Sequence, residues 1–267
     1  MTDAILYRLG TCAILVLCGC GLASTCLAQE LARPAMLGTM KADRILFLGN
    51  SITLHGVHVP YGWLNYCGMA ASMPEKDYAH VLVAALEART GGHLRLSPTA
   101  SADGAAGGEP ANIVNLADIF ERRYLSNYSN APLQPQIAWK ADIVVLQCGE
   151  NVVRDTFDPA AFKQSLGALL TALQAAGNPQ VFITSQILGG GGALDEIKRQ
   201  VCAEDPTHRA YVDLSSFHQD PTNFASAEPY YTGIIVGHPG DKGMGRIAAA
   251  LLEAMLARSG AGPAAAP

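Results

Sequence analysis

Three residues that are far apart in the sequence could together transfer an acyl group. Ser51 follows the apolar run 45–48, Asn151 follows the apolar run 143–146, and His238 lies near the C-terminus. Acyl transfer requires a nucleophile, a hydrogen-bond donor to the developing oxyanion and a proton acceptor. We therefore interpret the serine as the nucleophile, the asparagine as the oxyanion donor and the histidine as the general base.

Each of these residues also has an ordinary structural interpretation. Ser51 could be a turn or helix-capping serine, and Asn151 could be a turn former behind its glycine. His238 could cap the helix that follows it. The catalytic interpretation is favoured because all three residue types occur together, each at or near the end of a predicted element.

The elements that would position these residues alternate between strands and helices. Apolar runs rich in branched residues predict five strands, at 44–48, 93–96, 142–147, 180–184 and 210–214. Amphipathic stretches predict helices at 77–89, 113–124, 159–176, 193–203 and 241–258. This alternation favours an α/β fold with a doubly wound, five-stranded parallel sheet. Ligands bind such sheets at the carboxyl ends of the strands, where Ser51 and Asn151 fall.

The three motifs resemble, in this order, those of the SGNH (GDSL-type) hydrolase superfamily. Gly49-Asn50-Ser51 resembles the first block, Gly149-Glu150-Asn151 the Gly-x-Asn block, and His238-Pro239 with Gly243 the last block. The resemblance extends from residue 44 to about residue 255. It implies a flavodoxin-like three-layer α/β/α fold, no metal and no cofactor. It also implies hydrolysis of esters, commonly of acyl groups on carbohydrates or lipids, by a bacterial secreted enzyme.

One departure from the family concerns the acid of the triad. The family usually has an aspartate three residues before the histidine, where this chain has Ile235. A base needs a partner on Nδ1 that holds its tautomer. We expect a backbone carbonyl near Ile235 to do this in a Ser–His dyad, with Asp241 and Glu228 as the alternative carboxylates. Asp241 is better explained as the N-cap of the last helix.

A second departure concerns the glycine that supplies another oxyanion N–H group in the family. Gly104, Gly107 and Gly108 all lie in the loop 97–110 and could take this role. We choose Gly104 as the candidate.

Four further residues could contribute to the site. Glu150 could be a second catalytic carboxylate, although a glutamate at a sheet rim is more often ion-paired or solvated. Tyr61, Trp63 and Tyr66 could form an aromatic wall for a sugar, or could pack their loop onto the domain.

Length and composition predict a single globular domain. The chain has 267 residues, of which 49% are hydrophobic and 15% charged, and its net charge is -5. It lacks the clustered Lys and Arg of a nucleic-acid surface. We expect a signal peptide at 1–28, an SGNH-hydrolase-like domain at 29–258 and a disordered tail at 259–267.

The N-terminal segment predicts export without a membrane span. An apolar run at 12–22 precedes the small-x-Ala site Cys26-Leu27-Ala28. Secreted or periplasmic export is favoured. The competing interpretation is a lipoprotein signal with a lipid anchor at Cys20. Three cysteines remain outside this segment, which is too few for a disulfide framework, and no spacing resembles a zinc site.

These observations predict an exported serine esterase that removes a small acyl group, with acetyl as the expected case, from a carbohydrate or similar ester. A polysaccharide O-acyltransferase could use the same site, with a sugar hydroxyl in place of water. A non-catalytic carbohydrate- or envelope-binding protein that has lost the triad acid is the alternative from another class.

Overall fold

The computed structural model describes residues 34–97, 109–125, 128–189, 192–227 and 233–262. The predicted signal peptide and the candidate anchor Cys20 lie outside these ranges. Among the described helices, none combines the length and the apolar character needed to cross a membrane.

The central element is a five-stranded, all-parallel sheet in the order β4-β3-β5-β6-β7. Its strands are β3 (Ile45–Gly49), β4 (Ile113–Asn115), β5 (Ile143–Leu146), β6 (Gln180–Thr184) and β7 (Arg209–Val212). The described helices are α2 (Tyr78–Thr90), α3 (Gln134–Ala138), α4 (Pro159–Gly177), α5 (Ala193–Ala203) and α6 (Asp241–Ser259). A short antiparallel pair, β1 (Met36–Leu37) and β2 (Met40–Lys41), precedes the sheet.

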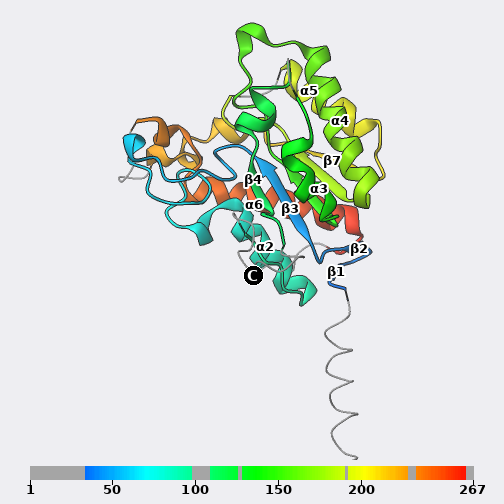
Figure 1. Cartoon of the computed structure of the whole chain (residues 1–267). Coiled ribbons are helices and arrows are strands. Elements are labelled where there is room, and N and C mark those ends of the chain that lie inside the picture. The colour runs from blue at the N-terminus through cyan, green and yellow to red at the C-terminus, as the bar shows by residue number, and fades with distance from the viewer. Residues whose placement is uncertain (1–33, 98–108, 126–127, 190–191, 228–232, 263–267) are drawn as a thin grey trace, which may run out of the picture. The chain divides into compact units, whose positions relative to one another are not determined.

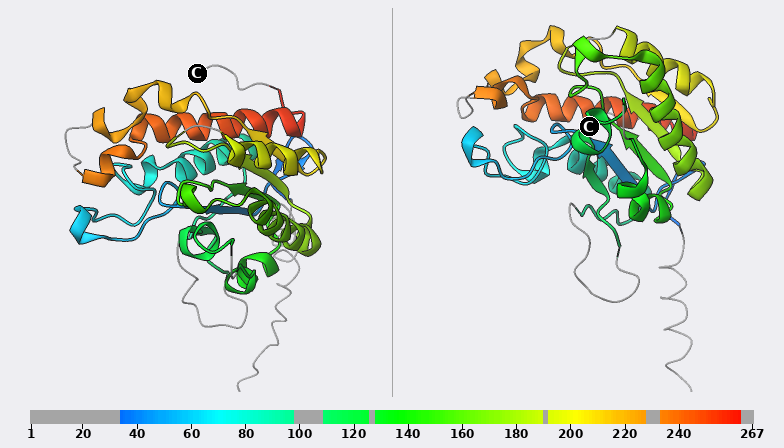
Figure 2. Two further views of the ribbon diagram at one scale, coloured as in Figure 1. Left: turned by 90° about the horizontal axis from the view of Figure 1, so that it is seen from above. Right: turned by 45° about the horizontal axis from the view of Figure 1, so that its top comes forward.

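Helices cover both faces of the sheet, as the alternation of side chains along β3 shows. Ile45 and Phe47 join the hydrophobic cluster under α2 and α6, whereas Leu46 and Leu48 join the cluster under α3, α4 and α5. Helices α2 and α6 lie side by side on one face (Figures 1 and 2). Because both faces are buried, the strands read as continuous apolar runs. The structure confirms the predicted three-layer α/β/α fold.

One predicted strand and one predicted helix are wrong. Residues 93–96 belong to no strand, and the strand beside β3 is β4, at the start of the predicted helix 113–124. The segment 93–96 is instead held by Asn112, just before β4. The main-chain N–H of Asn112 donates to the Ser97 carbonyl, its Oδ1 accepts from the Ser97 N–H, and its Nδ2 donates to the Arg95 carbonyl. Only the π-helical turn Ala117–Glu121 remains of the predicted helix. A strand of three residues is too short to show a strand periodicity, so its residues could not be distinguished from those of the adjoining helical turn.

Helix α6 ends one residue beyond the predicted helix 241–258. Ser259, the first residue of the predicted tail, is the last residue of this helix; it is buried, and the backbone of Thr39 donates to its carbonyl. Residues 263–267 of the predicted tail lie outside the described ranges.

Candidate active site

Ser51 lies in a tight turn at the carboxyl end of β3. The N–H groups of Thr53 and Leu54 both donate to the carbonyl of Asn50 at 2.9 Å, which closes the turn. Gly49 is required before it, because a Cβ at this position would overlap the Thr53 side chain. The chain therefore leaves the sheet sharply and presents the half-buried serine at its rim.

His238 lies between the 3-10 helix Gly233–Gly237 and α6, where the fold fixes its main chain on both sides. Its N–H group donates to the carbonyl of Ile235 at 2.9 Å, and its own carbonyl accepts from Ala225 at 2.9 Å. The side chain is only 6% exposed. Nε2 lies 2.9 Å from the Oγ atom of Ser51.

The other ring nitrogen of His238 fixes the tautomer. Nδ1 lies 3.1 Å from the main-chain oxygen of Ile234, which can only accept a hydrogen bond. The proton of the neutral ring is therefore on Nδ1, and Nε2 is free to accept the Ser51 hydroxyl proton. This is the arrangement that we expected, with the carbonyl one residue earlier than Ile235.

The surroundings of His238 keep the imidazole neutral. Burial lowers the pKa of His238 because it disfavours the imidazolium, and the charge of His55 lowers it further. The hydrogen bond to Ile234 acts in the opposite direction. A neutral ring at neutral pH is the form that can act as a base.

Asn151 follows β5 in a turn that depends on Gly149, whose φ is +125°. The side-chain Nδ2 of Asn151 donates to Glu121 Oε2 at 2.6 Å, and its Oδ1 accepts from Arg122 Nη2 at 3.0 Å. One N–H of the amide remains for an oxyanion, and Asn151 lines the same cleft as Ser51.

Glu150 is held by hydrogen bonds and forms no ion pair with any described residue. Its carboxylate accepts from the backbone of Ile187 at 2.8 Å, from Asn50 at 2.6 Å and from Gln147 at 2.9 Å. Burial raises the pKa of Glu150, although Lys198 lowers it. These contacts link the ends of β3, β5 and β6 and give this residue a structural explanation.

The open cleft around Ser51 has a volume of about 710 Å³. Tyr61 stacks on His58, with ring centroids 3.9 Å apart, and both residues line this cleft. Trp63 is 1% exposed and packs into the core, which is the second of the two alternatives considered for it. Tyr66 is not among the described lining residues, which are Ser51, His55, His58, Tyr61, Met69, Asn115, Ala117, Asp118, Arg122, Glu150, Asn151, Leu188, Ile234, Gly237 and His238.

Of three other predicted positions, the structure describes only Asp241. Asp241 is the first residue of α6, whose N-cap is Gly240, so the N-cap assignment is wrong. Its carboxylate accepts from Ser72 N at 2.8 Å and from Ser72 Oγ at 2.6 Å. The candidate oxyanion glycine Gly104 and the alternative acid Glu228 lie outside the described residues.

Three residues around the candidate site were not predicted from the sequence: Asn115, Glu121 and Arg122. Asn115 ends β4, donates to the carbonyl of Leu54 at 2.7 Å and lines the cleft. Its position at a strand end was a usable signal, but the strand itself was misplaced. Glu121 and Arg122 had no local signal, because charged residues in an amphipathic stretch normally face solvent.

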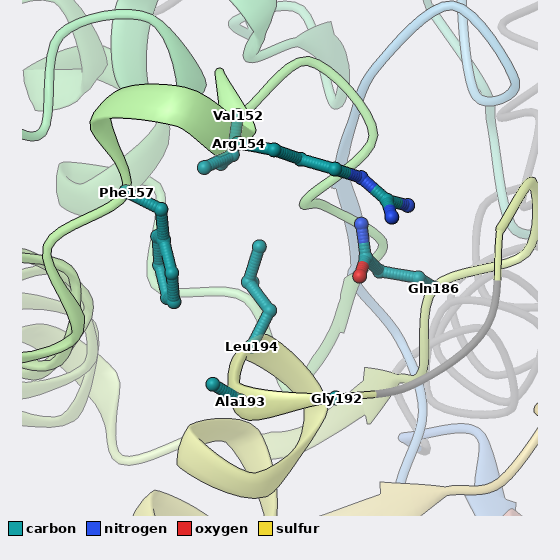
Figure 3. A pocket seen from close by; sticks show the side chains of 7 residues that line it. All are labelled: Val152, Arg154, Phe157, Gln186, Gly192, Ala193 and Leu194. Atoms are coloured by element: carbon teal, nitrogen blue, oxygen red, sulfur yellow. The ribbon is translucent and has the colours of Figure 1, made fainter.

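A smaller pocket of about 160 Å³ lies between the segment 152–157 and the start of α5 (Figure 3). Val152, Phe157 and Leu194 form its apolar lining, and the side chains of Arg154 and Gln186 point toward one another (Figure 3). Neither Ser51 nor His238 is among its described lining residues.

Comparison with known proteins gives structural likeness without sequence matches. Neither protein-family models nor curated protein sequences match the chain. A similar solved structure is a two-domain esterase active on acetylated mannans, co-crystallised with mannopentaose. It has 13% identity, a TM-score of 0.51, and coverage of 93% of this chain and 58% of that chain. A second structure of a two-domain esterase active on acetylated mannans has 13% identity, a TM-score of 0.51 and coverage of 90% and 53%.

A family two carbohydrate esterase from Cellvibrio japonicus has 15% identity, a TM-score of 0.48 and coverage of 81% of this chain and 61% of that chain. The chain thus spans little more than half the length of the two-domain esterases. At 13% identity the likeness to these two-domain esterases establishes a shared fold, which is the fold that the resemblance to the SGNH hydrolases implies.

Proposed function

We propose that this protein is a serine esterase of the SGNH type that removes a small acyl group from a carbohydrate ester. The observation that carries the proposal is the chain of contacts Ser51 Oγ, His238 Nε2 and Ile234 O, with distances of 2.9 Å and 3.1 Å. This chain combines a hydroxyl, an unprotonated nitrogen facing it and a fixed tautomer, which nucleophilic catalysis requires.

In the proposed mechanism, Ser51 Oγ attacks the ester carbonyl carbon while its proton moves to His238 Nε2. The carbonyl oxygen becomes an oxyanion, which accepts hydrogen bonds from the Ser51 main-chain N–H and from the Asn151 amide. His238 then protonates the leaving alcohol oxygen, which leaves an acyl group on Ser51. His238 then takes a proton from a water molecule, whose oxygen attacks the acyl carbon. When the bond between this carbon and Ser51 Oγ breaks, His238 returns the proton to Ser51 Oγ, and the carboxylic acid leaves.

The substrate class is supported by the form of the cleft. An open cleft of about 710 Å³ with a stacked His58–Tyr61 pair suits a sugar ring, whose apolar face packs on aromatic rings. The two-domain esterase with the same fold is active on acetylated mannans. We therefore propose that the substrate is an acetyl ester of a carbohydrate and that the protein is exported.

The test uses a fluorophosphonate probe and p-nitrophenyl acetate. The wild type should be labelled and should hydrolyse the ester, whereas Ser51→Ala should do neither. Equal labelling of both proteins would refute Ser51 as the nucleophile. A wild type that binds carbohydrate but neither hydrolyses esters nor takes the probe would support the non-catalytic alternative.

A further inference from the structure

Glu121 is a buried carboxylate whose described partners are all N–H donors. Its side chain is completely inaccessible, and it forms no ion pair with any residue in the described ranges. It accepts from Asn50 Nδ2 at 3.1 Å, from Asn151 Nδ2 at 2.6 Å and from the main-chain N–H of Gly149. A buried charge without a cation is expensive and needs such hydrogen bonds.

The three donors belong to the two segments that build the candidate site. Asn50 directly precedes Ser51 at the end of β3, and Gly149 begins the turn that carries Asn151 at the end of β5. Glu121 therefore connects the segment of the nucleophile with the segment of the oxyanion donor. Hydrogen bonds between a carboxylate and these two segments alone indicate a specific role rather than general packing.

The contacts at Asn151 also select one orientation of its amide. The oxygen and nitrogen ends of an asparagine side chain are nearly equal in size, so shape alone does not distinguish them. A carboxylate only accepts and a guanidinium only donates. With Glu121 at Nδ2 and Arg122 at Oδ1, a flipped amide would have mismatched partners at both ends. A flipped Asn151 would present an acceptor to the oxyanion.

The local backbone explains how two consecutive residues reach opposite ends of one amide. The π-helical turn Ala117–Glu121 ends at Glu121, and Arg122 follows as its C-cap. Arg122 is exposed and is held in place by Asp118 at 2.8 Å. π-Helical turns are rare and often occur at functional sites, because the extra residue redirects the side chains that follow.

We propose that Glu121 is a positioning residue, which together with Arg122 holds the Asn151 amide in the orientation that donates to the oxyanion. The proposal rests on the esterase function proposed above. It assigns to these residues an effect on the transition state that acts through Asn151.

The test is a double-mutant cycle with p-nitrophenyl acetate as the substrate. Glu121→Gln keeps the size of the side chain but places an NH2 group against donors. We expect kcat to fall by about 10- to 100-fold, part of the loss for a missing oxyanion donor, with KM changed by less than about twofold. In the Asn151→Ala background, the same substitution should lower kcat by less than about threefold.

A second variant keeps the test decisive if Glu121→Gln does not fold. Arg122→Met removes the exposed donor to Asn151, and we expect a loss in kcat of about three- to tenfold that also disappears in the Asn151→Ala background. The matched control is Arg123→Met, an exposed neighbour outside the cleft lining, which should leave kcat unchanged.

The outcomes separate this inference from the proposed function. If Glu121→Gln lowers kcat equally in the wild-type and Asn151→Ala backgrounds, or changes only KM, the positioning role is overturned and the esterase function stands. An inactive wild type would overturn the esterase itself.

Discussion

At the scale of single residues, the site depends on where protons are held. His238 carries its proton on the nitrogen that faces a main-chain oxygen, so no carboxylate is needed to define its tautomer. The pairing of Ser51 with His238 could be predicted from sequence, because each belongs to a recognisable motif. Glu121 could not, because its partners lie 71, 28 and 30 residues away and leave no local pattern.

The first prediction concerns the pH dependence of hydrolysis. The pKa of His238 lies below its ordinary value of 6.5, chiefly because burial disfavours the imidazolium. The imidazole is neutral and active above this pKa and protonated below it. The value of kcat/KM should therefore rise with pH through a midpoint below 6.5 and stay level through neutrality. Rates from about pH 4.5 to about pH 8 measure this, and a midpoint above the ordinary value would contradict it.

The second prediction concerns the carboxylate nearest in sequence to the histidine. Asp241 bonds to Ser72, so Asp241→Asn should change kcat by only a few fold. Replacing a true triad aspartate by an amide lowers kcat by about 10⁴-fold, because the amide holds the wrong imidazole tautomer. Steady-state kinetics of the folded variant, with Glu228→Gln beside it, would distinguish these cases. A collapse of turnover in either variant would identify a relocated third member.

At the scale of elements, the strands that are buried on both faces are the ones whose positions could be predicted from the sequence. Strands β3, β5 and β6 lie within a residue or so of their predicted positions, because strands covered on both faces leave continuous apolar runs. Strand β4 has only three residues, and its pairing with β3 is specified by the tertiary fold. The turn after β3 is fixed by a network beneath it, in which Asn50 donates to Glu121 and to Glu150.

The third prediction tests that network. Asn50→Asp would place a third carboxylate against Glu121 and Glu150 and remove both amide donors. We expect the free energy of unfolding to fall by about 3 kcal/mol at neutral pH. The loss should be smaller in acid, because a protonated aspartate can donate one hydrogen bond. Urea titrations at about pH 5 and about pH 8 measure the difference, and equal stability of both proteins at the higher pH would exclude the network's role.

At the scale of the described domain, the sheet edge that carries the candidate site and the opposite edge are held by different contacts. Ser51 and Asn151 lie at the carboxyl ends of the strands. The β1–β2 hairpin precedes the amino end of β3, where Thr39 donates to the Ser259 carbonyl through its N–H at 2.9 Å and its hydroxyl at 3.0 Å. Stability at this edge can therefore change without a change in the chemistry.

The fourth prediction uses two glycines at this edge. Gly38 has a φ of +56°, and a Cβ there would clash with the carbonyl of Ser259. Gly260 has a similar φ of +66° but open space around it. Gly260→Ala should cost about 1 kcal/mol of unfolding free energy, and Gly38→Ala about 2 kcal/mol or more. Thermal unfolding measures both, and kcat should be unchanged. Equal costs would show that the Ser259 contact is absent in solution.

The main-chain oxygen that orients His238 also affects how this protein can vary. Ile234 contributes only its backbone to the contact, and its side chain is 55% exposed. Nearly any residue at this position offers the same oxygen, so an alanine scan would find two members of the proposed catalytic chain and miss the third. Only a change in the path of the loop, such as a proline that displaces the 3-10 helix or a deletion within it, would reveal the carbonyl's contribution. Relatives with this arrangement could therefore diverge freely at the position of Ile234 and still keep the same chemistry.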